Sequence, residues 1–191
     1  MAGPVSTVRS DSGVGSILDS GVTTREPRRV PPIDDFEIPR IPASAGALVF
    51  DAGGRLLVLK PTYKSGWTIP GGQMEDDGET PWEACRREVG EETGLVVETG
   101  RLVCVDFLRP RPERPGGMRF LFDCGVFDDE TLAGIVVQEA EISEYRLEAM
   151  ADALALFSGP VRRRVRAGAG APHTVYLEDG RGVDAVAERP R

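Results

Sequence analysis

Short apolar runs separated by turn residues recur from about residue 43 onwards and predict a domain of mixed strands and helices. Ala47–Phe50 and Arg55–Leu59 flank Asp51-Ala52-Gly53-Gly54, a turn typical of a β-hairpin. Trp67-Thr68-Ile69 predicts a short strand, and Leu95–Leu108 predicts a strand-rich stretch. The first half of the domain therefore alternates extended segments with one long polar stretch between them.

The second half follows the same mixed pattern. The elements that we expect there are a Pro/Arg/Gly loop over 109–117, strands within 118–127 and 135–147, a helix over 149–157, and a late hairpin of Thr174–Leu177 with Val183–Val186. Strands and helices mix without a regular βαβ rhythm. The pattern favours an α/β layered sandwich over a doubly wound sheet.

The segment before this domain has a different composition. Residues 1–42 are rich in Ser, Gly, Thr, Pro and Arg and show little apolar periodicity. We therefore predict a flexible N-terminal tail over 1–42 and one domain over 43–191. The start, MAGPVSTVRS, lacks the apolar core of a secretory signal.

Bulk properties exclude several classes of protein. Of the 191 residues 40% are hydrophobic, enough for one core, and no apolar run approaches the roughly 20 residues that cross a membrane. A net charge of −8 argues against an extended nucleic acid as partner. Three cysteines without a CxxC pair favour neither structural zinc nor a disulfide framework, and they fit a cytoplasmic location. One histidine excludes multi-histidine metal sites, and no G-x-S-x-G elbow is present.

The polar stretch in the middle of the chain predicts a well-delimited helix. Thr80 is a good N-cap, Pro81 suits the first helical position, and Glu83 completes a capping box. Gly94 can adopt the left-handed conformation that ends a helix. We therefore expect a helix from about Pro81 to Thr93.

This helix should carry an apolar stripe and, beside it, an acidic one. At about 100° per residue the apolar stripe holds Trp82, Cys85 and Val89, and the acidic stripe holds Glu88, Glu91 and Glu92. Such close carboxylates repel one another unless a divalent cation lies among them. A solvated acidic face is the alternative interpretation. The glycine-rich segment just upstream favours a metal site.

The stretch GGQMEDDGETPWEACRREVGEETGL, from Gly71 to Leu95, resembles the Nudix hydrolase signature of a glycine, a glutamate and then REUxEExGU, where U is aliphatic. The resemblance is close over Trp67–Leu95 and extends in outline over residues 43–157. It implies an α/β/α sandwich with a mixed sheet and a loop–helix–loop signature. It also implies hydrolysis, dependent on Mg²⁺ or Mn²⁺, of the diphosphate linkage between a nucleoside diphosphate and another group.

Carried over by position, the resemblance implies roles for residues of the helix and its loop. Glu88, Glu91 and Glu92 would bind the metal, with Glu88 or Glu92 also acting on the attacking water, and Arg87 would brace the loop by pairing with Glu79. A backbone carbonyl, first choice Gly72, would complete the metal shell. Six residues separate Gly72 from Glu79 where the family has five, which leaves Gly71, Gly72 and Gln73 open for that carbonyl.

Further candidates lie outside the signature. Glu141 is the first choice and Glu139 the second for an additional catalytic acid or base, against the alternative of an exposed loop acid. Arginines around the proline-rich loop are candidates for binding substrate phosphates, or else ordinary surface residues; they are Arg109, Arg111, Arg114 and Arg119. The basic residues between 162 and 166 predict a helix face or a weak anion site.

Two functions from different classes remain open. The first is a pyrophosphohydrolase acting on ADP-ribose, a nucleotide sugar, a dinucleotide or a nucleoside triphosphate. The second is a non-catalytic module that binds a nucleotide or ADP-ribose on the same fold. An RNA 5′-end hydrolase would need a broad basic surface that the composition lacks. The oligomeric state is open, with a homodimer favoured by base rate alone.

Overall fold

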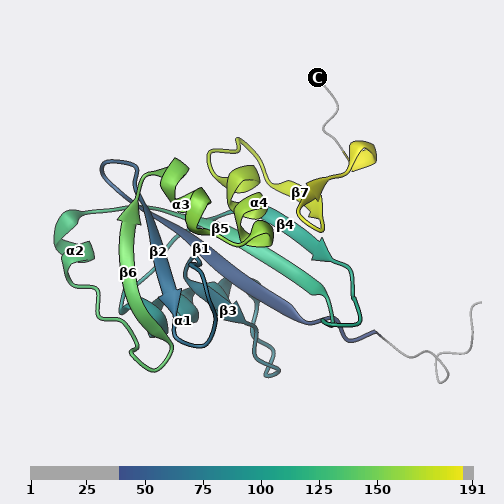
Figure 1. Cartoon of the computed structure of the whole chain (residues 1–191), viewed down its shortest axis with the longest axis horizontal. Coiled ribbons are helices and arrows are strands. Elements are labelled where there is room, and N and C mark those ends of the chain that lie inside the picture. The colour runs from purple at the N-terminus through teal and green to yellow at the C-terminus, as the bar shows by residue number, and fades with distance from the viewer. Residues whose placement is uncertain (1–38, 187–191) are drawn as a thin grey trace, which may run out of the picture. The chain divides into compact units, whose positions relative to one another are not determined.

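The computed structural model describes residues 39–186, and the strands in this range form one mixed sheet (Figure 1). The predicted N-terminal tail falls mostly on residues 1–38, outside the described range. The sheet order is β6-β2-β1-β5-β4-β7-β8, with β3 pairing with β1 off this path. The strands are β1 (Ala43–Asp51), β2 (Leu56–Pro61), β3 (Gly71–Gln73), β4 (Arg101–Leu108), β5 (Gly117–Phe127), β6 (Ile142–Glu148), β7 (Val175–Glu178) and β8 (Arg181–Gly182).

The predicted first hairpin is confirmed. β1 and β2 are antiparallel, and Asp51 closes the turn by accepting hydrogen bonds from the backbone N–H (2.7 Å) and Nε (2.6 Å) of Arg55. β1 is the central strand: its first half pairs with β3 on one side, and β5 runs parallel to it on the other. Segments far apart in the sequence therefore meet at the start of β1.

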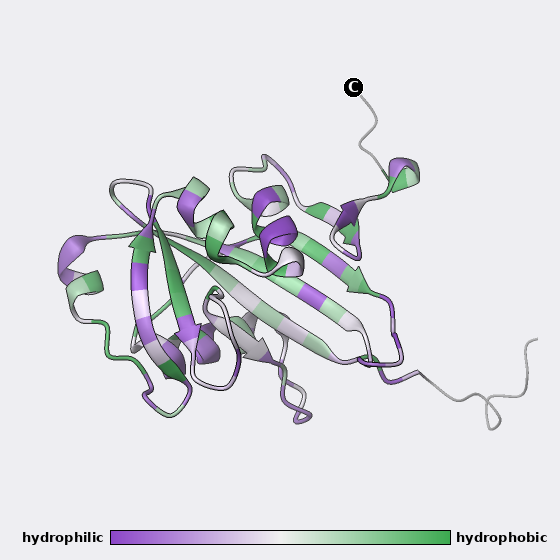
Figure 2. Ribbon diagram, viewed as in Figure 1, coloured by the Kyte–Doolittle hydropathy of each residue, from purple (hydrophilic) through white to green (hydrophobic). Residues whose placement is uncertain are grey.

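Alternating side chains of the inner strands face two separate cores. On β1, Leu48 belongs to one core while Ala47 and Val49 belong to the other, and β2 alternates in the same way. Figure 2 shows β2 as an almost continuous apolar strand, as expected for a strand buried on both faces. Helix α1 (Pro81–Thr93) packs on one core, while α3 (Met150–Leu156) and α4 (Gly159–Gly168) pack on the other. The predicted α/β/α sandwich is confirmed.

Three local predictions need correction. Trp67-Thr68-Ile69 forms only single bridges, Thr68 to Leu59 and Trp67 to Phe157, instead of a strand. The stretch from Leu95 becomes a strand only at Arg101. In the late hairpin the second strand is β8 and not Val183–Val186, of which Asp184–Val186 is a short 3₁₀ helix.

The last error has a clear cause. Asp179 and Gly180 both have positive φ (51° and 74°), so they form the entire two-residue turn and the return strand begins at Arg181. A short helix, α2 (Asp129–Ala133), follows β5 and was not anticipated. Within residues 39–186 no helix is long and apolar enough to cross a membrane.

Candidate functional site

Helix α1 has the ends that the sequence predicts. The Thr80 hydroxyl accepts a hydrogen bond from the backbone N–H of Glu83 (3.3 Å), and the Glu83 carboxylate accepts one from the N–H of Thr80 (2.8 Å). Gly94 ends the helix with φ 74° and ψ 0°. These caps fix the two ends of α1, and its buried residues Ala84, Cys85 and Val89 face the sheet.

Arg87 ties the loop before α1 to the helix. Its Nε donates to Glu79 Oε1 (2.8 Å), and its Nη2 donates to the carbonyl of Gln73 (3.0 Å). Its Nη1 donates to Glu88 Oε1 (3.0 Å) and Glu91 Oε2 (2.9 Å). The guanidinium holds the pKa of Glu79 below its usual range. One side chain therefore fixes the loop and contacts two of the three helix glutamates.

Glu88 and Glu92 lie against the two glycines of β3. A Cβ at Gly72 would be 2.3 Å from Glu88 Oε1, so the carboxylate occupies space that only glycine leaves free. Glu92 Oε2 accepts a hydrogen bond from the N–H of Gly71 (2.7 Å). The pair Gly71-Gly72 thus lets both carboxylates pack on the strand backbone.

The electrostatics of these two glutamates differ from those of surface acids. Glu92 is only 4% exposed, and its burial, with repulsion from Glu88 and Glu141, raises its pKa to about 7 despite the Gly71 hydrogen bond. Burial likewise raises the pKa of Glu88, against the lowering effect of Arg87. Glu88 is balanced in part by Arg87, whereas within residues 39–186 no basic side chain lies within ion-pair distance of Glu92.

A cavity of about 530 Å³ opens beside them. Glu88, Glu92 and Glu141 contribute its acidic side chains, and Lys64, Arg119 and Arg164 contribute the basic ones. The loop that carries Glu141 is tied to the end of β2, because Thr62 donates from its N–H to the Glu141 carbonyl and from its hydroxyl to the Ala140 carbonyl, each at 2.8 Å. Segments from β1, the loop after β2, α1, β5 and α4 meet around this cavity.

The structure separates the predicted site residues into two groups. Glu88, Glu92, Glu141, Gly72 and Arg119 line the cavity. Other candidates do not: Glu139 is exposed outside it, and Glu91 is exposed and paired with Arg87. Within residues 39–186 no group of three or more acidic, histidine or cysteine side chains is assembled to hold a metal ion. Glu91 is exposed and shares Arg87 Nη1 with Glu88, and the assignment of all three helix glutamates as metal ligands stays a prediction.

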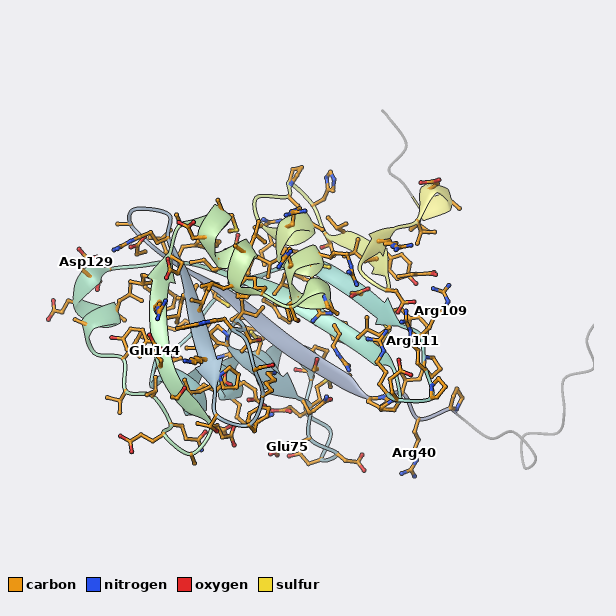
Figure 3. All side chains as sticks on the ribbon, in the orientation of Figure 1. Arg40, Glu75, Arg109, Arg111, Asp129 and Glu144 are labelled. Atoms are coloured by element: carbon orange, nitrogen blue, oxygen red, sulfur yellow. The ribbon has the colours of Figure 1, made fainter. Side chains whose placement is uncertain are left out.

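Arg109 and Arg111 also lie away from the cavity. They project beyond the end of β4 (Figure 3), where Arg109 pairs with Glu178 and Arg111 with Asp179 (3.7 Å). Arg114 pairs with the same aspartate at 3.1 Å. These arginines fasten the β4–β5 loop to the β7–β8 turn, so their charge is already balanced by protein carboxylates.

Several cavity residues were not anticipated. Tyr63 and Lys64 lie in the loop after β2, where the sequence gives no signal beyond a loop position. Arg164 belongs to the basic stretch on α4, whose amphipathic spacing predicts a helix but does not show which arginine faces inwards. Their roles depend on how α4 and the loop pack on the sheet.

The strand register indicates which backbone carbonyl faces the glutamates. In the β1–β3 pair, Ala47 N–H bonds to the Pro70 carbonyl and Met74 N–H to that of Ala43, which fixes the alternation. The polar backbone groups of Gly72 therefore point towards β1, and those of Gly71 point away from it. The hydrogen bond from Gly71 N–H to Glu92 agrees with this phase.

The molecule thus combines an α/β/α sandwich with a polar cavity into which one loop–helix unit brings two carboxylates, the buried Glu92 and the partly buried Glu88. Comparison with known proteins identifies it: the NUDIX domain model matches residues 40–167, and the chain belongs to the NUDIX family.

Relatives of known sequence agree with this assignment. The chain is 42% identical over 62 residues to a MutT-like protein of Streptomyces ambofaciens, covering 32% of this chain and 40% of that protein. It is 33% identical over 103 residues to an ADP-ribose pyrophosphatase of Methanocaldococcus jannaschii, covering 52% of this chain and 60% of that protein. The matches thus span about half the length of these curated relatives.

Solved structures show the same fold. The MutT protein of Methanosarcina mazei Go1 has a TM-score of 0.54 and 26% identity, over 68% of this chain and 91% of that one. A MutT protein of Bacillus halodurans has a TM-score of 0.57 over 71% of this chain and 87% of that one. At 20% identity, this similarity supports the fold alone.

Proposed function

We propose that this protein is a divalent-metal-dependent hydrolase that cleaves the diphosphate linkage of a nucleoside diphosphate joined to another group. Membership of the NUDIX family supports the reaction class. The observation that carries the proposal is the pair of carboxylates at one wall of a cavity of about 530 Å³, the buried Glu92 and the partly buried Glu88. A buried carboxylate such as that of Glu92, which makes no ion pair in the described part of the chain, is costly unless a ligand supplies the balancing charge.

The donor chemistry of this wall fits Mg²⁺ or Mn²⁺. Carboxylate and carbonyl oxygens are the ligands that such ions prefer, together with water and substrate phosphates. Glu88, Glu92 and the Gly71 carbonyl would hold the ion, since the register turns the Gly72 carbonyl towards β1. When bound, the metal supplies positive charge to the phosphates and lowers the pKa of a coordinated water.

Other residues of this wall have supporting roles in the proposal. Glu141 faces the same space as Glu92 and would accept the proton of the attacking water, as a general base placed on a separate loop. Arg87 would hold the Gln73 carbonyl and Glu79 so that the glycines stay against the carboxylates. Glu91 joins the metal ligands only if its contact with Arg87 breaks.

The test is turnover of a nucleotide panel with Mg²⁺ or Mn²⁺, with the cleavage position assigned in ¹⁸O-labelled water. Glu92→Gln should abolish nearly all turnover in a folded protein. Glu98→Gln, at an exposed position after α1, is the matched control and should retain it. Hydrolysis of a confirmed substrate by Glu92→Gln at the wild-type rate would refute the site assignment.

One observation favours a second candidate, a non-catalytic nucleotide-binding module. Arg87 engages both Glu88 and Glu91, and the described residues 39–186 assemble no three-ligand group. Such a module would show a rise in melting temperature with ADP-ribose or a related nucleotide, and no product with any metal. Metal-dependent product release decides for the hydrolase.

A further inference from the structure

The cavity is electrically polar. Its acidic side chains come from α1 and the Glu141 loop, while two of its basic ones, Arg119 on β5 and Arg164 on α4, come from the other side of β1. Among the described residues Arg164 has one carboxylate partner, Asp106, and Arg119 has none. The arrangement of these two arginines indicates which chemical group of a ligand they can bind.

Arg119 lacks a balancing carboxylate. Its guanidinium donates only to backbone carbonyls, those of Met118 (2.9 Å) and Gly116 (3.3 Å), and within residues 39–186 no acidic side chain lies within ion-pair distance of it. It is half-buried, and burial together with the nearby charges of Arg164 and Arg114 lowers its pKa. A half-buried cation of this kind gains most from an anion that enters with the ligand.

Arg164 is held in place beside it. The fully buried Asp106 accepts hydrogen bonds from Arg164 Nη1 (3.3 Å) and from the N–H of Gly180 (2.8 Å). Asp106 also lies directly opposite Arg119 in the β4–β5 register. Arg119 and Arg164 therefore have a single carboxylate, that of Asp106, near them. The basic wall of the cavity keeps a net positive charge.

The two walls lie apart by a distance set by the sheet. Ser44 of β1 pairs with Gln73 on one side and with Arg119 on the other, so β3 and β5 are two strand spacings apart, about 10 Å. Glu88 and Glu92 contact the glycines of β3. A ligand that reaches both walls therefore carries phosphates at one end and a second anionic group some way along.

We propose that Arg119, with Arg164 beside it, binds an anionic group of the substrate beyond the metal-held diphosphate, and that the preferred substrates are nucleoside triphosphates and related polyphosphates. Diphosphates that end in a neutral sugar lack a group to meet this wall. The inference rests on the proposed hydrolase function and names its substrate class.

Paired substrates with a common nucleoside diphosphate test it: UTP with UDP-glucose, ATP with ADP-ribose, and GTP with GDP-mannose. The wild-type kcat/KM should favour the triphosphate of an accepted pair by at least about tenfold. Arg119→Gln should lower kcat/KM for the triphosphate by about 10- to 100-fold, as expected for loss of a charge-assisted hydrogen bond. The same variant should change kcat/KM for the nucleoside diphosphate sugar by less than about threefold. Arg119→Lys should restore part of the preference, and Arg166→Gln, exposed on the same helix α4, should leave it unchanged.

Calorimetry with inorganic tripolyphosphate and pyrophosphate in Mg²⁺ gives a readout independent of turnover. Wild type should bind tripolyphosphate more tightly than pyrophosphate, and Arg119→Gln should abolish the difference. Three results would overturn the inference. The first is that Arg119→Gln lowers kcat/KM equally for both members of a substrate pair. The second is that wild type prefers the sugar diphosphate, and the third is that wild type binds tripolyphosphate no more tightly than pyrophosphate. Absence of any turnover by wild type would instead refute the hydrolase proposal, and the calorimetry would still decide the anion site.

Discussion

Replacing Glu92 by glutamine should stabilise the metal-free protein at neutral and alkaline pH. The carboxylate is 4% exposed, and burial is the main cause that raises its pKa from 4.5 to about 7. In the unfolded chain the same group ionises near its ordinary value. Glutamine keeps an oxygen for the Gly71 N–H and carries no charge, so it removes the electrostatic cost and retains the hydrogen bond.

The sign and size follow from proton linkage. Between pH 4.5 and 7 the folded state holds a proton on Glu92 that the unfolded state has lost, so the free energy of unfolding of wild type falls as pH rises through this window. A pKa difference of one unit corresponds to about 1.4 kcal/mol. The ionised Glu92 therefore lowers the free energy of unfolding of wild type by about 3 kcal/mol above pH 7, and this loss vanishes below about pH 4. For a domain of this size it corresponds to about 6–12 °C in melting temperature.

Thermal unfolding in EDTA from pH 4 to 8 measures the effect, with Glu98→Gln as the control at an exposed position. The gap between Glu92→Gln and wild type should open between pH 4.5 and 7 and then stay constant. Saturating Mg²⁺ at pH 8 should raise the melting temperature of wild type and not that of Glu92→Gln. A variant that is less stable than wild type at pH 8, or a gap independent of pH, would refute the reasoning.

Three further predictions test the surroundings of the site. In Gly72→Ala the new Cβ meets only the flexible end of Glu88, so this variant should change the melting temperature little and lower kcat at least about tenfold. Gly71 has φ 138°, and a Cβ there would be 2.2 Å from the Ala45 carbonyl oxygen, so Gly71→Ala should destabilise the fold by several kcal/mol. Circular dichroism melts separate the two variants. Arg87→Lys keeps the charge but loses the fork across loop and helix, and should lower kcat about 10- to 100-fold in a steady-state assay while the protein stays folded. Asp106→Asn should cost about 3–5 kcal/mol of unfolding free energy in urea titrations, because it removes the fully buried counter-ion of the partly buried Arg164. A loss below about 1 kcal/mol would contradict this.

The parts of the molecule that the sequence predicts well are those set by neighbouring residues. The helix expected from about Pro81 to Thr93, with caps at Thr80 and Gly94, depends on local hydrogen bonds and is confirmed. The first hairpin depends on alternating apolar positions and one turn. In the late hairpin the dipeptide Asp179-Gly180 is itself a signal for a two-residue turn, and placing the return strand directly after it would have given Arg181 as the first paired residue.

Other features of the site depend on contacts between distant segments and escape such reasoning. Helical spacing places Glu91 beside Glu88, but it does not reveal that Arg87 holds Glu91 at the surface. Of the arginines on α4 within the described residues, Arg164 lines the cavity. The basic stretch does not reveal this, because the position of Arg164 depends on its pairing with the buried Asp106 of β4. The acidic wall was therefore predictable in outline, and the basic wall was not.

The extra residue in the signature loop shows how the fold separates tolerant from constrained positions. At one end Gly71, Gly72 and Gln73 are fixed, since they pair with β1 while Arg87 binds the Gln73 carbonyl. At the other end Glu79 is fixed by Arg87 and by the backbone N–H of Glu75 (2.8 Å).

Only the turn between these anchors is free to lengthen. Asp77 caps it by accepting a hydrogen bond from the N–H of Glu79 (3.0 Å), and Gly78 adopts φ 97° with open space around it. Figure 3 shows Glu75 on this exposed loop. No cavity residue is attached to this turn. The register of β3, and with it the positions of the Gly71 carbonyl, Glu88 and Glu92, therefore does not depend on the added residue.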